Sequence, residues 1–145
     1  AGSNPPYRVP NSIITSPSEL RAMFGLELQD YGRLLPYVTA LPVGTQLNVN
    51  TASEYVLASL SSDISLAAAE SMIREQRGLN GFIDINNTFE RLLDQDLLPR
   101  INAVSQHFLL VASVSISNNQ TTMYSLLQRD DSGIARSVFR SLGVE

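Results

Sequence analysis

Few side chains in this sequence have the type and spacing that chemistry at a site requires. Asp130 and Asp131 are adjacent in an Asp-Asp-Ser-Gly segment that is typical of a turn. Calcium is a hard cation that binds the carboxylate and carbonyl oxygens of loops, so these two aspartates are the candidate metal ligands, although no EF-hand spacing surrounds them. The alternative is structural, because aspartate is also favoured in turns for bonding its own backbone.

The rest of the sequence lacks the patterns of a catalytic site. His107 is the single histidine and there is no cysteine, so neither a second imidazole nor a thiolate is available for nucleophilic or metal chemistry. The sequence also lacks a glycine-rich phosphate loop and the His-Glu-x-x-His and Gly-x-Ser-x-Gly patterns. We therefore expect that the protein is not an enzyme, and that His107 has a surface or packing role.

The most informative segment is polar and runs from Leu47 to Glu54. Asn48 and Asn50 form an Asn-x-Asn turn, whose side chains can bond neighbouring backbone groups and fix the approach to a helix. Thr51 and Glu54 have the spacing of a capping box at a helix N-terminus. A segment of this kind is typical of one unit of a helix-hairpin-helix array.

Short helices separated by turns are predicted for about the first 100 residues. Ser16 and Glu19 form a second capping box, with proline at the first helical position. Arg74 and Arg77 suit the negative end of the helix that closes at Gly78. Apolar spacing and caps predict helices near 17–24, 27–34, 52–60 and 65–78, and another after a cap at 86–88.

The apolar period changes from helix to strand near Phe108. Alternate residues from Phe108 to Ile116 predict one buried face, with serines on the other. A hairpin turn at 118–120, a returning strand at 121–129 and a third strand at 134–140 follow. The chain is therefore α+β, with helices first and an antiparallel sheet afterwards. Three strands leave edges and a face uncovered, so we expect an N-terminal helix or another subunit to complete the sheet.

Composition is that of a folded protein of 145 residues, with 43% hydrophobic and 17% charged residues. No apolar run reaches the roughly 20 residues that a membrane-spanning helix needs, and no signal-like segment opens the chain. The first three residues, Ala-Gly-Ser, resemble the remnant of a cloning site. We therefore expect a fragment whose targeting segment lies outside this sequence.

A helix-hairpin-helix module that binds DNA is the alternative function. DNA-gripping hairpins present backbone N–H groups through a glycine-rich turn at a helix N-terminus. Here the corresponding turn, Ser61 to Ser65, has no glycine and contains Asp63. The net charge of −4 also repels phosphate. These features argue against a nucleic-acid partner.

Taken in order, the motifs resemble the minor pseudopilin K family of bacterial type II secretion systems. Ser16 to Arg21, preceded by Tyr7, Arg8 and Asn11, resembles the family's first helical unit. Ser105 to Phe108 resembles the Ser-x-Tyr-Phe that begins a pilin strand, with His107 in place of the tyrosine. The motif residues with a structural role in this resemblance are Asn48, Asn50, Thr51, Ala52, Arg77, Phe82 and Phe108.

The resemblance implies a definite architecture. Residues 1–105 would form a helical insert of tandem helix-hairpin-helix, SAM-like units, and residues 106–145 would be the later strands of an incomplete pilin-like sheet. The family's leader peptide, transmembrane helix and first strand would precede this sequence. Relatives bind calcium in the pilin part, which again directs attention to Asp130 and Asp131.

The resemblance also implies a structural function. The protein would be a minor pseudopilin at the tip of the type II secretion pseudopilus, where it takes part in tip assembly and protein export. Its expected partners are minor pseudopilins I and J, with exported substrate proteins as further candidates. The whole protein would be anchored in the bacterial inner membrane, with this portion in the periplasm.

Overall fold

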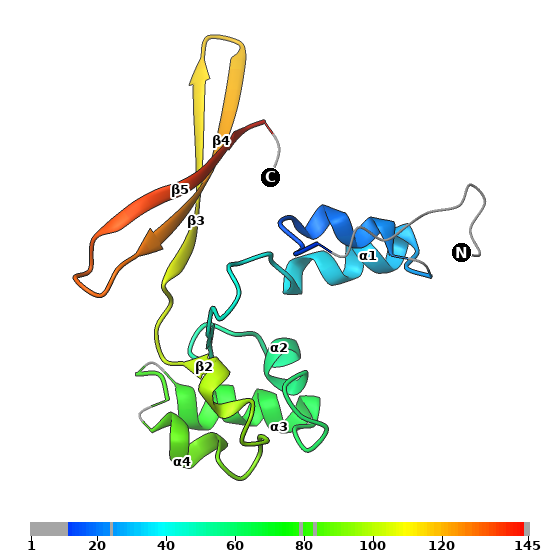
Figure 1. Ribbon diagram of the computed structural model, residues 1–145, viewed down its shortest axis with the longest axis vertical. Helices are drawn as coiled ribbons and strands as arrows, with labels where there is room; N and C mark the ends of the chain where they lie inside the picture. Colours follow the sequence, from blue (N-terminus) through cyan, green and yellow to red (C-terminus); the bar gives the residue numbers. More distant parts are fainter. Residues whose placement is uncertain (1–11, 24, 79, 83, 144–145) are drawn as a thin grey trace. The chain divides into compact units, whose positions relative to one another are not determined.

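The computed structural model describes residues 12–23, 25–78, 80–82 and 84–143 (Figure 1). The chain divides into two compact units, Ala1–Pro42 and Val43–Glu145. Tyr7, Arg8 and Asn11, which take part in the family resemblance, lie outside the described residues. The boundary predicted between residues 105 and 106 falls within the second unit, where helices give way to strands.

Three short helices make up most of the described part of the first unit: η1 Pro17–Ala22, α1 Leu28–Leu34 and η2 Leu35–Tyr37. The predicted capping box at η1 is confirmed. The backbone N–H of Ser18 donates to Ser16 Oγ, and the backbone N–H of Ser16 donates to Glu19 Oε1 at 3.1 Å. None of the described residues in these helices is buried, so they enclose no core of their own.

The second unit begins with a helical body, which we define as residues 43–105. Its elements are β1 Leu47–Asn48, α2 Glu54–Ala58, α3 Leu66–Ser71, η3 Met72–Arg77, α4 Ile85–Phe89, η4 Leu98–Arg100 and β2 Ile101–Asn102. The two short strands pair in parallel, with Leu47 opposite Ile101 and Asn48 opposite Asn102. This pairing places the polar segment beside the end of the helical body.

The hydrophobic core of the described residues lies in the helical body. The rings of Phe82 and Phe89 pack edge to face, with their centroids 5.3 Å apart. Leu57 from α2 and Ala69 from α3 are fully buried, so the apolar spacing that predicted these helices is the spacing of core contacts. The buried hydrophobic residues are Val49, Ala52, Leu57, Ile64, Ala69, Met72, Phe82, Phe89, Leu93 and Ile101.

The starts of two helices differ from the prediction. The N-cap of α2 is Ser53, whose Oγ accepts from the backbone N–H of Val56. The capping box predicted for Thr51 and Glu54 is therefore wrong, and Thr51 lies in the preceding turn. The N-cap of α4 is Asp84 rather than a residue of the segment 86–88. α2 therefore begins later than predicted, and α4 begins earlier. In both segments several neighbouring residues have side chains that can cap a helix.

The helix predicted over 65–78 does form, but it changes its winding. The helix begins where it was predicted, and its N-cap is Ser65, whose Oγ accepts from the backbone N–H of Ala68. After Ser71 the helix continues as the π-helical segment η3, which ends at Gly78 with a φ of 45°. π-helical turns are often found at functional sites, and Arg77 is the last residue of this one.

Three antiparallel strands follow, in the order β3-β4-β5: β3 His107–Ile116, β4 Asn119–Arg129 and β5 Ala135–Leu142 (Figure 1). Ile116 pairs with Asn119, so the turn consists of Ser117 and Asn118 and not of 118–120 as predicted. Ser117 has a φ of 55°, which a two-residue hairpin turn requires. A β-bulge in the β4–β5 pairing makes Val138 an extra residue in β5.

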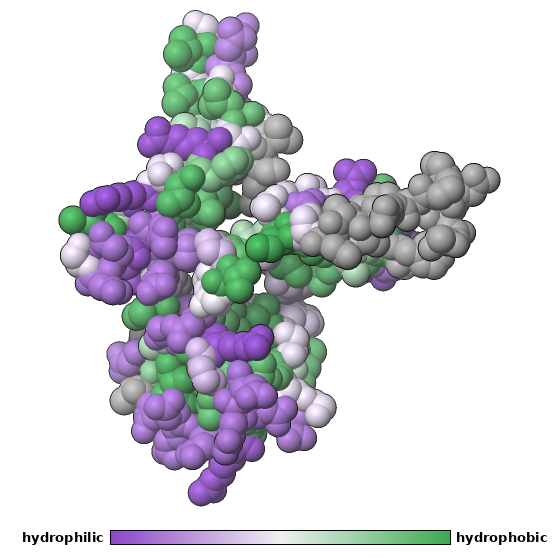
Figure 2. Space-filling model, in the orientation of Figure 1, coloured by the Kyte–Doolittle hydropathy of each residue, from purple (hydrophilic) through white to green (hydrophobic). Residues whose placement is uncertain are grey.

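The sheet is far more exposed than the alternating pattern predicts. Ser125 is the one buried residue among the described residues of the three strands, and Figure 2 shows apolar residues at the surface over these strands. Leu109 and Leu110, which point to opposite faces of β3, are both about half exposed. The prediction of one buried face is therefore wrong for these residues, and the expectation that an N-terminal helix or another subunit completes the sheet stays a prediction.

Candidate functional site

Asn50 is the centre of a hydrogen-bonded clamp inside the helical body. Its Oδ1 accepts from the backbone N–H of Phe82 at 2.6 Å, and its Nδ2 donates to the carbonyl oxygen of Ala103 at 3.2 Å. Gly81 lies against this side chain so closely that a Cβ there would be 2.9 Å from the amide atoms of Asn50. One side chain therefore joins the turn after η3 to the end of the body.

Asn48 extends this clamp in two directions. Its Oδ1 accepts from the backbone N–H of Asn50 at 2.9 Å, which closes the turn. Its Nδ2 donates to Ser105 Oγ at 2.9 Å. We name Asn48 and Asn50 together the asparagine clamp, because their amides hold three segments that are distant in the sequence.

Arg77 supports the clamp from the helix. Its Nη1 donates to the carbonyl oxygen of Ala52 at 2.5 Å and lies 3.4 Å from that of Val49. The prediction that Arg77 serves the dipole of its own helix is therefore incomplete, because its guanidinium binds the backbone of the polar segment. Arg74 behaves differently, since it is exposed and pairs with Glu75 at 3.4 Å.

The structure brings together most of the predicted motif residues. Asn48, Asn50, Arg77 and Phe82 meet at the clamp, and Ala52 is buried beneath it. Thr51 is exposed in the turn and its hydroxyl lies 3.4 Å from the carbonyl oxygen of Asn48. Phe108 lies apart from the clamp, in β3, where the guanidinium of Arg129 is 5.4 Å from its ring centroid.

Residues that the motif did not include complete the arrangement. Gln46 Nε2 donates to the carbonyl oxygen of Pro99 at 2.8 Å, and Gln46 Oε1 accepts from Asn102 Nδ2 at 2.7 Å. Ser105 accepts from Asn48. For Gln46 and Asn102 the only signal in the sequence was their type, because an amide side chain can donate and accept at once. Ser105 was identified only as the start of a strand.

His107 has a packing role within the described structure. Both of its ring nitrogens are buried, and neither has a hydrogen-bond partner among the described residues. The described part of the chain holds no group of three or more histidine, cysteine or acidic side chains that could bind a metal ion, so His107 belongs to no such group there.

Asp130 organises its own turn. Its Oδ1 accepts from the hydroxyl of Ser132 at 2.6 Å and from the backbone N–H groups of Ser132 and Ile134, each at 3.0 Å. The Ser132 hydroxyl and then the Ile134 N–H hold the pKa of Asp130 below its ordinary value. Asp130 and Asp131 alone supply fewer oxygens than the six to eight or so that calcium takes. The calcium site stays a prediction.

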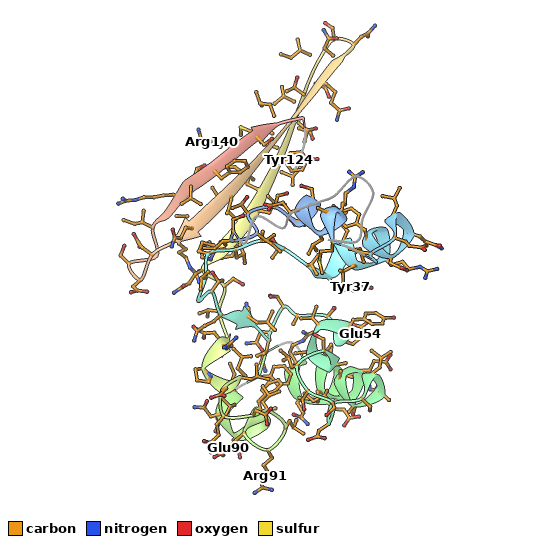
Figure 3. The ribbon with its side chains drawn as sticks, turned by 45° about the vertical axis from the view of Figure 1, so that its right-hand side comes forward. Tyr37, Glu54, Glu90, Arg91, Tyr124 and Arg140 are labelled. Atoms are coloured by element: carbon orange, nitrogen blue, oxygen red, sulfur yellow. The ribbon has the colours of Figure 1, made fainter. Side chains whose placement is uncertain are left out.

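The turn between α2 and α3 lacks the features of a DNA-gripping hairpin. Asp63 is exposed there, and its backbone N–H donates to Ser61 Oγ at 3.2 Å. The helical body carries eight acidic and four basic residues. Glu90 and Arg91 both point away from it (Figure 3).

None of the helices in the described ranges is long and apolar enough for a bilayer crossing.

Comparison with known proteins assigns the family. Two family models, both described as "Type II secretion system (T2SS), protein K", match residues 1–43 and 47–108 and together cover most of the chain. The type II secretion system protein K of Pseudomonas aeruginosa is 37% identical over 144 residues, covering 96% of this chain and 42% of that protein. The protein K of Pectobacterium carotovorum is 32% identical, covering 84% of this chain and 40% of that protein.

The fold agrees with a solved structure. A chain in the crystal structure of the GspK-GspI-GspJ complex from enterotoxigenic Escherichia coli matches with a TM-score of 0.73 and 20% identity, over 99% of this chain and 53% of that chain. The present chain spans less than half the length of the Pseudomonas aeruginosa and Pectobacterium carotovorum proteins. The family models and the relatives nevertheless match over most of this chain, and the chain belongs to the type II secretion system protein K family.

Proposed function

We propose that this chain is the periplasmic portion of a minor pseudopilin that acts at the tip of the type II secretion pseudopilus, without catalysis. The observation that carries the proposal is the uncovered sheet, which offers apolar residues and an open edge to a neighbouring chain. The family match supplies the system in which that neighbour is found. Minor pseudopilins I and J are the proposed partners, and exported substrates are secondary ones.

The two edges of the sheet differ in a way that supports assembly through β3. No charged residue occurs from Phe108 to Gln128, and β3 forms an outer edge over its ten residues. The edge strand β5 instead carries Arg136 and Arg140 and the β-bulge at Val138. Charges and bulges protect an edge against pairing, whereas an apolar uncharged edge favours it. The β3 edge is therefore the proposed contact.

The helical body supports a packing role rather than a reactive one. The polar groups of the asparagine clamp and of Arg77 are used in bonds within the chain. Groups used in this way fix a shape and leave their atoms unavailable to a phosphate or a substrate. We infer that the body acts as a rigid surface, on the periplasmic side of the bacterial inner membrane.

The proposal is tested by mixing the chain with minor pseudopilins I and J and measuring mass by size-exclusion chromatography with light scattering. We expect a complex with one copy of each protein. Val111→Arg on β3 should weaken it, whereas Val138→Arg on β5 should not, and both valines are 52% exposed. Separate elution of the three parent proteins would contradict the proposed function. Equal effects of the two variants would contradict the assignment of the edge.

A mobility-shift assay at low salt tests the DNA-binding alternative. We expect no shift, because the body is acidic and its hairpin turn lacks glycine. A shift that weakens steeply as salt rises would support the alternative, since phosphate contacts release counterions.

A further inference from the structure

The segment that connects the helical body to the sheet is held from both sides. On the side of the body, Asn50 Nδ2 donates to the carbonyl oxygen of Ala103 and Asn48 Nδ2 donates to Ser105 Oγ. On the side of the sheet, Arg129 Nη2 donates to the carbonyl oxygen of Ser105 at 2.8 Å. If the connection were free to bend, its carbonyl and hydroxyl groups would bond to water instead of to the body and the sheet.

Ser105 is the residue where the two sides meet. Its hydroxyl binds the asparagine clamp, while its carbonyl oxygen binds β4, and both bonds are partly buried. The backbone N–H of Arg129 also donates to the carbonyl oxygen of Gln106 at 2.7 Å. One residue of β4 therefore binds two consecutive carbonyls of the connection.

Arg129 is itself held in place. Its guanidinium lies over the ring of Phe108, which belongs to the neighbouring strand β3. The adjacent carboxylate, Asp130, directs its Oδ1 to the Ser132 and Ile134 donors of its own turn. A planar guanidinium that is stacked and bonded in this way loses little freedom on binding a carbonyl, and lysine would not replace it.

We propose that Ser105 is a locked joint, through which Asn48 and Arg129 fix the helical body to the sheet. Rotation of the connection on the body side of Ser105 would break the bond to Asn48, and rotation on the sheet side would break the bond to Arg129. The joint makes the body and the sheet one mechanical unit, so that a partner bound to the sheet also determines where the body is presented. The joint consists only of residues of this chain, so the proposal does not depend on which partners bind the sheet.

The absence of cysteine from the sequence makes the joint measurable. Ser62→Cys in the body and Ser115→Cys in β3 place spin labels at two exposed positions, and double electron–electron resonance gives the distance between them. We expect one narrow distribution in the labelled parent. Ser105→Ala combined with Arg129→Gln should widen it at least twofold.

A matched control separates the joint from general loosening. Ser113→Ala with Arg136→Gln makes the same changes of residue type elsewhere in the sheet, and it should leave the distribution narrow. Protection of the Phe82 amide against hydrogen exchange should persist in both variants, since this amide donates to Asn50 and reports that the body is folded. A broad distribution in the labelled parent, or an equally narrow one in both variants, would overturn the proposal.

Discussion

The backbone N–H of Phe82 lies 2.6 Å from Asn50 Oδ1, although 32 residues separate the two in the sequence. The other end of the same amide reaches Ala103, 53 residues away. Asparagine is suited to this position because its amide accepts at one end and donates at the other. The Asn-x-Asn motif thus encodes long-range contacts of the fold as well as a local turn.

Asn50→Ala should lower the free energy of unfolding by about 2 kcal/mol, because it leaves the Phe82 N–H and the Ala103 carbonyl without their partner. Urea denaturation followed by circular dichroism measures this loss. Asn86→Ala, at an exposed position in α4, is the control and should change stability by no more than about 0.5 kcal/mol. Similar losses in the two variants would show that the clamp is not a major source of stability.

Gly81→Ala and Gly44→Ala separate backbone strain from a steric clash. Both glycines have a positive φ, 76° and 87°, so each alanine should cost about 1 kcal/mol of strain. Gly81→Ala should cost more, because its Cβ would lie 2.9 Å from the Asn50 side chain, while Gly44 has no such neighbour within 4 Å. Equal unfolding midpoints in urea would rule out the close contact.

The sequence predicted the elements of this fold better than their contacts. Ser16 and Ser65 were identified as helix starts, because a capping side chain acts on N–H groups only two or three residues away. The start of α2 was assigned to Thr51, which has the required spacing to Glu54. Ser53 is the cap in the structure, and only the turn formed by Asn48 and Asn50 decides between the two.

The candidate site was predicted only in part, because the sequence indicates local structure better than contacts between distant segments. Asn48, Asn50, Arg77 and Phe82 were identified from the family motif, but their mutual contacts depend on chain segments that fold back from far away. Ser105 marked a strand start in the sequence, and its bonds to Asn48 and Arg129 became visible only in the structure. The exposed sheet also differed, because alternation reports which face can be buried and not whether a layer covers it.

Arg77→Lys should lower the free energy of unfolding by about 1 kcal/mol, because a lysine ammonium is a point charge without the planar fork that meets the Ala52 and Val49 carbonyls. Arg74→Lys is the matched control on the same segment. Its ion pair with Glu75 is exposed on both sides and should contribute at most about 0.5 kcal/mol. Thermal unfolding that ranks the two variants in the opposite order would contradict the role given to Arg77.

His107→Leu should raise the free energy of unfolding by about 1 kcal/mol, because it removes two buried nitrogens that lack partners in the described structure and keeps a similar volume. Calorimetry at neutral pH measures the change. Gln106→Leu, at an exposed neighbouring position, should give no such gain. A loss of stability in His107→Leu would indicate that the imidazole makes a polar contact.

The turn at Asp130 should loosen in acid. Hydrogen bonds from Ser132 and Ile134 lower the pKa of this carboxyl in the folded chain, so its contribution is complete above the ordinary value of 3.8 and disappears as the pH falls through the lower folded value. The protection factor of the Ile134 amide, which NMR gives relative to the intrinsic exchange rate at each pH, should fall below pH 4 or so. Asp130→Ala should show the low protection factor at every pH.

Calcium provides a second measurement on the same turn. If Asp130 and Asp131 bind it, titration should shift the amide resonances of residues 130–134, and Asp131→Asn should abolish the shift. The capping box at Ser16 and Glu19 is the internal control, since its carboxylate should not respond. Resonances that stay unchanged at millimolar calcium, the weak end of the range of roughly 10⁻⁴–10⁻³ M for extracellular sites, would contradict the predicted site.

The contrast between β3 and β5 limits where this chain can stand in a larger structure. A neighbour can extend the sheet from β3, but Arg136, Arg140 and the bulge at Val138 oppose extension beyond β5. Addition of strands on both sides of this sheet would require each edge strand to accept a partner. The three strands therefore have one edge that accepts a neighbour and one that resists it, which gives the sheet a single direction of extension.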